Sequence, residues 1–157
     1  NMKNMNHSIY QSPFSWRYGS EPMRQIFSEE NKFKLWRKIW VALARAQSKE
    51  GLISKKELED LEKNQNNIDI ERILEIEKET KHDVVAAIKE FAEKAKVGGG
   101  KIHLGATSMD ISDNAETIRI SEAVSRSYFL PDECFAPHPL PTKWSKFIPH
   151  AIALFLA

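Results

Sequence analysis

Residues 28–51 read SEENKFKLWRKIWVALARAQSKEG, and this stretch decides the fold class. Its large apolar side chains recur at spacings of three and four, which is the period of an α-helix with one buried face. They are Phe33, Trp36, Trp40 and Leu43, with Leu35, Ile39 and Ala42 widening the stripe. Ser28 is a cap residue at the start, and Gly51 can end the helix in a left-handed conformation. The stretch therefore predicts a long helix whose apolar face lies in the core.

Helix start signals also stand on both sides of this stretch. Upstream, Ser20 is a cap residue, and Pro22 is tolerated in the first turn of the helix that follows. Downstream, residues 54–57 read SKKE, which is a capping box in which serine and glutamate each satisfy a backbone N–H. Asp69 then caps another apolar run. We therefore predict short helices before and after the long one.

Two more helical runs complete this part of the chain. One follows residue 83 and ends before the glycines at 98–100, which we expect to form a flexible joint. The other continues to about Ala123. We find no strand pattern and no internal repeat, so we predict an all-α domain over residues 10–123.

The two ends of the chain differ from this helical part. Residues 1–9 are polar, and we expect them to be a disordered lead. Helical periodicity stops near residue 124, and five of the seven prolines follow, a density that a helix interior does not tolerate. Residues 124–157 are therefore either an extended irregular tail or the product of a changed reading frame. We favour the second interpretation and expect a divergent, frame-shifted tail.

Composition excludes several classes of protein. The 157 residues include 41% hydrophobic and 29% charged side chains, which is the balance of a soluble globular domain. The net charge of +1, with both signs mixed along the chain, argues against a nucleic-acid surface. No apolar run is long enough to span a bilayer. The lone cysteine, Cys134, excludes an internal disulfide framework and is typical of a reducing cytosol, so we expect a cytoplasmic protein.

Two polar stretches, 78–83 (KETKHD) and 102–114 (IHLGATSMDISDN), each precede an apolar helical run. Free backbone N–H groups and the helix dipole make a helix N-terminus a binding site for phosphate or carboxylate. His82, Thr107 and Ser108 fall at such predicted positions. A histidine can donate to an anion or move a proton at neutral pH. The two stretches therefore suggest a site for a small polyanion.

Each of these residues also has a purely structural explanation. Arg17 and Tyr18 lie in an aromatic, turn-rich loop, where the arginine could stack on a neighbouring ring or clamp an anion. His82 and His103 could be structural histidines, and the hydroxyls could be plain helix caps. The sequence has no metal-ligand spacing such as His-x-x-x-His, and its run of three glycines lacks the strand and spacing of a nucleotide-binding loop.

Three motifs in order carry a resemblance to a known family. They are Ser12-Pro13 with Arg17-Tyr18 and Ser20, then Lys81-His82-Asp83-Val84-Val85-Ala86, then His103-Leu104-Gly105-Ala106-Thr107-Ser108-Met109-Asp110 with Asp113-Asn114. Over Tyr10 to Ala123 the chain resembles the N-terminal domain of the adenylosuccinate lyase family, within the fumarase/aspartase superfamily. The resemblance implies an all-α fold and elimination of fumarate from adenylosuccinate, giving AMP, and from the succinylated aminoimidazole carboxamide ribotide of purine synthesis.

The resemblance also implies a site, an assembly and an absence of cofactors. It assigns substrate binding to Arg17 and Tyr18 near the phosphate, to Lys81, His82 and Asp83, to Thr107 and Ser108 at the succinyl part, and to His103 in the same pocket. The family works as a homotetramer on a polyanionic purine nucleotide and requires neither a cofactor nor a metal. Donors aimed at the carboxylate lower the barrier because negative charge builds there as a proton is removed.

The chain departs from the family in its later motifs. The family's acid, a histidine, and its base, a serine on a mobile loop, have no counterpart here, and the neighbours of His138 and His150 do not match the histidine motif. We therefore assign no catalytic residue and leave open only an assisting role for His82. We expect a truncated lyase, inactive alone.

Two other interpretations compete with a truncated lyase. One is a non-catalytic helical module that binds a purine nucleotide or a full-length lyase subunit. The other is a gene product that cannot fold, in which Phe33, Trp36 and Trp40 would be exposed for lack of a partner bundle and would cause aggregation.

Overall fold

The computed structural model describes residue 10 and residues 12–128, and every regular element within them is helical. Six α-helices follow one another in this part of the chain: α1 (Glu21–Ile26), α2 (Glu29–Lys49), α3 (Lys55–Asn64), α4 (Ile70–Thr80), α5 (Asp83–Lys94) and α6 (Ser108–Tyr128). A π-helical turn, η2 (Phe14–Tyr18), precedes α1, and a 3-10 turn, η3 (Gly99–Lys101), follows α5. The all-α prediction is confirmed for these residues.

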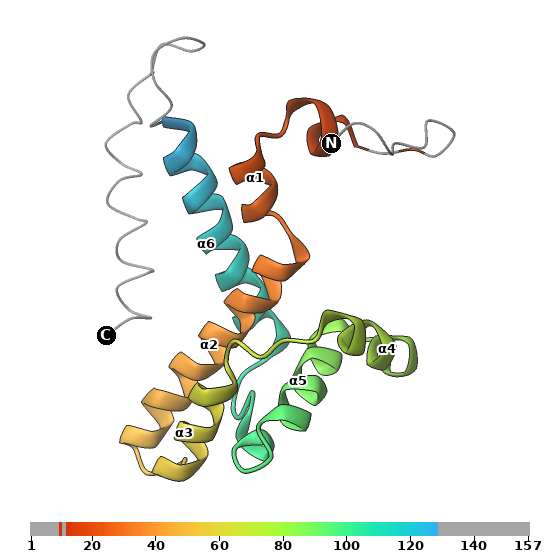
Figure 1. The fold of residues 1–157 in the computed structure, drawn as a ribbon. Coiled ribbons are helices and arrows are strands. Elements are labelled where there is room, and N and C mark those ends of the chain that lie inside the picture. The colour runs from red at the N-terminus through yellow and green to blue at the C-terminus, as the bar shows by residue number, and fades with distance from the viewer. Residues whose placement is uncertain (1–9, 11, 129–157) are drawn as a thin grey trace.

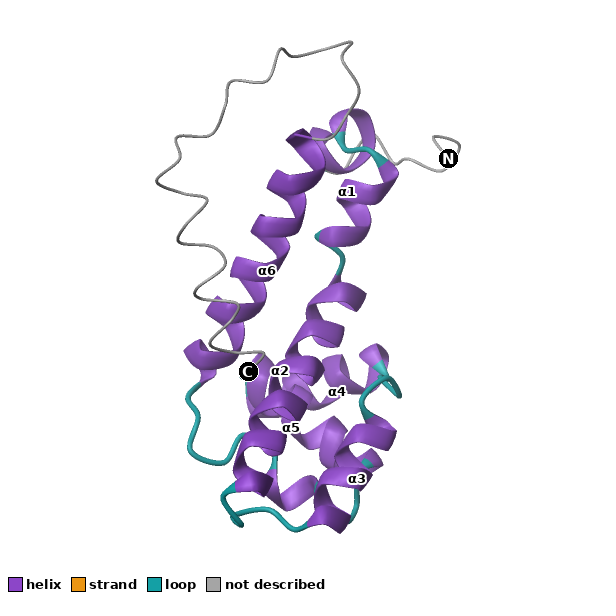
Figure 2. Cartoon of the chain, turned by 90° about the vertical axis from the view of Figure 1, so that its left-hand side faces the viewer, coloured by secondary structure: helices purple, strands orange, loops and turns teal. Residues whose placement is uncertain are grey.

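The helices form a narrow upper part and a broader lower part (Figures 1 and 2). In the upper part, α1 lies beside α6. In the lower part, α3 lies beside the C-terminal half of α2, and α4 and α5 pack together as a helical hairpin. Since α6 also packs against α2, the two longest helices connect both parts of the molecule.

Three of the predicted caps form as the sequence indicates, whereas Ser20 occupies the N-cap position of α1 without a side-chain cap hydrogen bond. The side-chain oxygens of Ser28, Ser54 and Asp69 each accept a backbone N–H three residues further on, at 3.2, 3.3 and 3.1 Å. Glu57 completes the capping box by accepting the backbone N–H of Ser54 at 2.8 Å. Gly51 follows α2 with a φ of +75°, in the left-handed region expected of it. These local signals set the limits of α2, α3 and α4.

The apolar stripe of α2 forms the centre of the core. Phe33, Trp36 and Trp40 are each no more than 3% exposed, and the Trp36 ring meets both other rings edge to face. Such aromatic pairs add stability beyond the area they bury. The prediction that this stripe lies in the core is confirmed, and the competing interpretation that leaves the three rings exposed is not supported. Residues of α3, α5 and the start of α6 cover them, among them Leu61, Val84, Ala87, Phe91, Ile111 and Ala115.

A buried ion pair also holds the lower part together. Arg37 of α2 pairs with Glu90 of α5, and the two residues are 1% and 0% exposed. The guanidinium also donates to the Asn64 carbonyl at 3.1 Å and lies 3.6 Å from the centre of the Phe91 ring. The backbone N–H of Asp69 donates to the second carboxylate oxygen at 3.1 Å. The pair therefore connects α2, α5 and the link between α3 and α4.

The glycine run at 98–100 is not the flexible joint that the sequence suggests. Its residues form η3 and the turn before it, and Gly98 and Gly99 are buried. A Cβ placed on Gly99 would lie 2.8 Å from the Cα of Ala92, which is closer than real Cβ contacts come. Glycine is needed here because the backbone packs directly on α5.

The last described helix extends past the predicted limit of the helical domain. We expected that domain to end at Ala123, but α6 continues through Tyr128. The lead at 1–9 and residues 129–157 of the predicted tail lie outside the described residues. The division of the chain at residues 123 and 124 therefore stays a prediction.

Candidate functional site

The first predicted polar stretch forms the sharp turn between α4 and α5. Lys81 ends α4 in the left-handed conformation, with a φ of +55°, and His82 is extended at the N-cap position of α5. The Thr80 hydroxyl donates to the His82 carbonyl at 3.2 Å, and the Asp83 carboxylate accepts the N–H of Val84 at 2.7 Å. This turn leaves Lys81, His82 and Asp83 exposed at the positive end of α5.

The second polar stretch forms a loop that is fixed to α2 at two points. The indole N–H of Trp40 donates to Nδ1 of His103 at 3.1 Å, and the side-chain amide of Gln47 donates to the Leu104 carbonyl at 2.7 Å. His103 and Gly105 both have positive φ, +67° and +71°, so the loop bends tightly between these contacts. The histidine is thereby placed by the core helix.

The same loop leads directly into the N-terminus of α6. Thr107 precedes the first residue of α6, its carbonyl accepts the Asp110 N–H at 3.1 Å, and its own N–H donates to the Asp110 carboxylate at 2.8 Å. Thr107 is exposed and Ser108 is half-buried. Both hydroxyl residues therefore stand at a helix start, as the sequence predicts.

His82 of the first polar stretch acts electrostatically on His103 of the second. Burial lowers the pKa of His103; the nearby Asp110 carboxylate opposes this shift, and His82 adds to it. Charges influence each other in this way only over short distances in salt. Between them, the starts of α5 and α6 can offer imidazole, ammonium and hydroxyl donors to an anion.

Arg17 and Tyr18 lie at the opposite end of the molecule. They belong to η2, which precedes α1, and α1 lies beside α6 away from its start, whereas Thr107 and Ser108 stand where α6 begins (Figures 1 and 2). A helix of 21 residues is about 31 Å long. The Arg17 guanidinium lies 4.6 Å from the centre of the Trp16 ring, so stacking on a neighbouring ring, one of the two alternatives, is observed.

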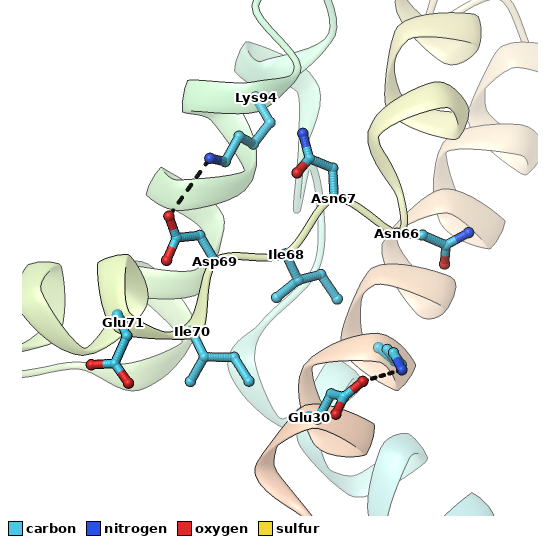
Figure 3. A pocket seen from close by; sticks show the side chains of 9 residues that line it. Glu30, Asn66, Asn67, Ile68, Asp69, Ile70, Glu71 and Lys94 are labelled. Carbon is cyan, nitrogen blue, oxygen red and sulfur yellow. Dashed lines mark hydrogen bonds and ion pairs between the residues drawn. The ribbon is translucent and has the colours of Figure 1, made fainter.

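The α3–α4 link lines a pocket of about 430 Å³, but none of the predicted site residues belong to it. Figure 3 shows its side chains, among them two lysine–carboxylate pairs. Lys94 lies 3.8 Å from Asp69, and Lys34 pairs with Glu30. Because both cations already have acidic partners, this pocket is a weaker candidate for anion binding than the two helix starts.

Comparison with known proteins places the chain in a family. No protein-family model matches it. The chain is similar to curated adenylosuccinate lyases, with 44% identity over 115 residues to that of Methanocaldococcus jannaschii and 38% over 118 residues to that of Saccharomyces cerevisiae. These matches cover 71% and 73% of this chain. The chain belongs to the fumarase/aspartase superfamily.

One solved structure shares the fold of this chain. A fumarate lyase from Mesorhizobium sp. BNC1 matches 94% of this chain and 41% of its own, with a TM-score of 0.61 and 20% identity. At that identity the likeness shows the fold alone. The chain spans about a quarter of the length of the curated relatives that it matches, 25% for the first and 24% for the second. It corresponds to the N-terminal portion of the superfamily.

The sequence did not reveal the residues that hold His103 and its loop in place. Trp40 was assigned only to the core, because an apolar stripe does not reveal where an indole N–H points. Gln47 lies on the polar side of the same helix pattern and gave no signal. Asp110 stood inside the quoted motif, where its carboxylate could have been recognised as a partner of the helix start.

Two further features, a cluster of metal ligands and a membrane-spanning helix, are absent from the described part of the chain. Among residues 10 and 12–128, no three His, Cys, Asp or Glu side chains are grouped so that they could hold a metal ion. None of the helices that the structure describes is long and apolar enough to cross a membrane.

Proposed function

We propose that this chain is the N-terminal part of an adenylosuccinate lyase and supplies one wall of its substrate site. The observation that carries the proposal is the pair of polar helix starts, with His82 at the N-cap of α5 and Thr107 and Ser108 at the start of α6, in a chain similar to curated adenylosuccinate lyases. The reaction proposed is elimination of fumarate from adenylosuccinate and from the related succinylated ribotide. The substrate is a polyanion, which suits two positive helix ends.

The geometry suggests how this wall would act. His82 is exposed at the N-cap of α5, and Lys81 beside it carries a full positive charge. Thr107 and Ser108 can donate hydrogen bonds at the start of α6 without adding charge. Such donors lower the barrier of the elimination if they face the carboxylate on which negative charge builds. Each of these residues binds or orients the substrate in this proposal, and none removes the proton.

The acid and the base of the reaction are not assigned to this chain. We infer that they and the homotetramer belong to the complete enzyme, of which this chain matches about a quarter. Arg17 and Tyr18 lie too far along α6 to join the histidines within one chain. If they hold the substrate phosphate, they do so at a different site of the assembly.

Binding and turnover together test the proposal. We expect the purified chain to bind adenylosuccinate by calorimetry and to release no fumarate. Lys81→Ala and His82→Ala should each weaken binding by about tenfold, the effect of losing one charge-assisted hydrogen bond. Lys38→Ala is the matched control, because Lys38 is an exposed lysine two residues from Trp40 and so on the far side of α2 from the histidines.

The outcomes separate the proposal from its alternatives. Equal affinities in the wild type, Lys81→Ala and His82→Ala would refute the helix-start site. If AMP, which lacks the succinyl part, binds as tightly as adenylosuccinate, the result would favour the non-catalytic nucleotide-binding module. Fumarate release by the mass-verified chain would show that the missing acid and base are present after all.

A further inference from the structure

The contact between Trp40 and His103 has a consequence for the chemistry of the histidine. Trp40 is 3% exposed and its ring is fixed by Trp36, Phe91 and the surrounding core. Its Nε1–H donates to Nδ1 of His103 at 3.1 Å, with the two rings edge to face at 85°. An indole nitrogen can only donate a hydrogen bond. The Nδ1 atom must therefore present a lone pair.

We propose that Trp40 is a positioning residue that holds His103 as the neutral tautomer with its proton on Nε2. A neutral imidazole carries one proton, and a lone pair on Nδ1 places that proton on Nε2. An imidazolium would carry a proton on both nitrogens, so its Nδ1–H would point at the indole N–H, and the hydrogen bond would be lost. The contact thus excludes one tautomer and disfavours the charged form.

The charged groups around His103 do not reverse this preference. Asp110 at the start of α6 favours the imidazolium, whereas His82 at the start of α5 disfavours it. On the side of α2 the neighbour is Trp40, which is neutral, and burial acts against the charged form more strongly than either charge acts. The side-chain amide of Gln47 donates to the carbonyl of the next residue, Leu104, at 2.7 Å and so fixes the backbone beside His103.

The inference changes what His103 can contribute. A neutral histidine with a fixed Nε2–H is a hydrogen-bond donor of set direction and a poor proton shuttle at neutral pH. That this donor serves an anionic substrate rests on the proposed function, whereas the tautomer itself does not. Comparison with a sequence motif would identify the histidine, whereas the hydrogen bond from Trp40 of the core helix α2 sets which ring nitrogen carries the proton.

Nitrogen NMR of the chain with ¹⁵N-labelled histidine tests the proposal without any substrate. Two-bond proton–nitrogen correlations identify the protonated ring nitrogen, and His103→Gln assigns the signal among the five histidines. We expect the Nε2–H pattern for His103 at neutral pH, and a titration midpoint below those of exposed histidines. The indole proton of Trp40 should shift with that same midpoint, because protonation breaks its hydrogen bond, and the indole proton of Trp36 should not.

Two variants separate the hydrogen bond from packing. Trp40→Phe keeps an aromatic ring and removes the N–H, and it should raise the His103 midpoint by about half to one pH unit, the value of one neutral hydrogen bond. Trp36→Phe is the control, an equally buried tryptophan one turn earlier in α2, and should leave the midpoint unchanged. An Nδ1–H pattern in the wild type, or a Trp40 indole signal that ignores the His103 titration, would overturn the proposal even if a variant failed to fold.

Discussion

Replacing Glu90 by alanine should destabilise the domain far more than the same change at Glu93, three residues further along α5. Both glutamates pair with an arginine of another helix: Glu90 with Arg37, and Glu93 with Arg72. The difference is burial. The side chains of the first pair are 0% and 2% exposed, whereas those of the second are 45% and 44% exposed.

The loss of stability in each variant depends on the groups that remain unpaired once the carboxylate is removed. Without Glu90, the buried Arg37 guanidinium keeps its charge but loses its only anionic partner among the contacts described here, and the Asp69 N–H loses its acceptor. Burial already lowers the pKa of Arg37, so the charge is costly where it stands. Leaving one member of a buried pair alone costs about 3–5 kcal/mol. The exposed Arg72 is solvated with or without Glu93, so that pair contributes little.

Urea unfolding followed by tryptophan fluorescence measures both effects, because Trp36 and Trp40 are buried in the folded state. With a slope of about 1–3 kcal/mol per molar urea, Glu90→Ala should lower the midpoint by more than about 1 M. Glu93→Ala should leave it nearly unchanged. A loss this large is a substantial part of the total stability of a domain, which is about 5–15 kcal/mol.

A double variant tests the reasoning itself. If the cost comes from an unpaired charge, Arg37→Met combined with Glu90→Leu should recover most of the stability lost in Glu90→Ala, because apolar residues of similar volume can replace a buried pair. Glu90→Gln should fall between, since its amide oxygen can still accept one hydrogen bond. The explanation would be refuted by equal losses in Glu90→Ala and Glu93→Ala, or by a double variant no more stable than Glu90→Ala.

Three further predictions concern the loops and caps. Gly99→Ala should destabilise by about 1–3 kcal/mol through overpacking, whereas Gly100→Ala, where an added Cβ meets nothing within 4 Å, should cost far less in the same urea assay. Ser54→Ala should lose about 1 kcal/mol by removing a helix cap, seen in the same midpoint. Burial lowers the pKa of His103 in the folded state, so its contribution to the free energy of unfolding is complete above the unfolded pKa of about 6.5 and is lost as the pH falls below that value. Between about pH 7.5 and 5.5, His103→Gln should therefore lose less stability than the wild type.

Much of the fold could be predicted from local patterns. The spacing of apolar residues placed α2 correctly, since that helix buries one continuous face, and Ser28, Ser54 and Asp69 marked helix starts because a cap involves residues only three apart. The glycines at 98–100 misled the prediction, because a flexible run and a close-packed one contain the same residues. Only the position of Ala92 on α5 distinguishes them.

The candidate site shows the same division between local and long-range information. The sequence by itself determined that His82 and Thr107 stand at helix starts, because capping depends on neighbours in the chain. The tertiary structure alone decided that His82 acts electrostatically on His103 and that Arg17 lies far from the start of α6. It also decided that the indole of Trp40, 63 positions away, donates a hydrogen bond to His103 and accepts none from it. Hydrogen bonds and burial across helices depend on how the helices pack, and no local pattern encodes that packing.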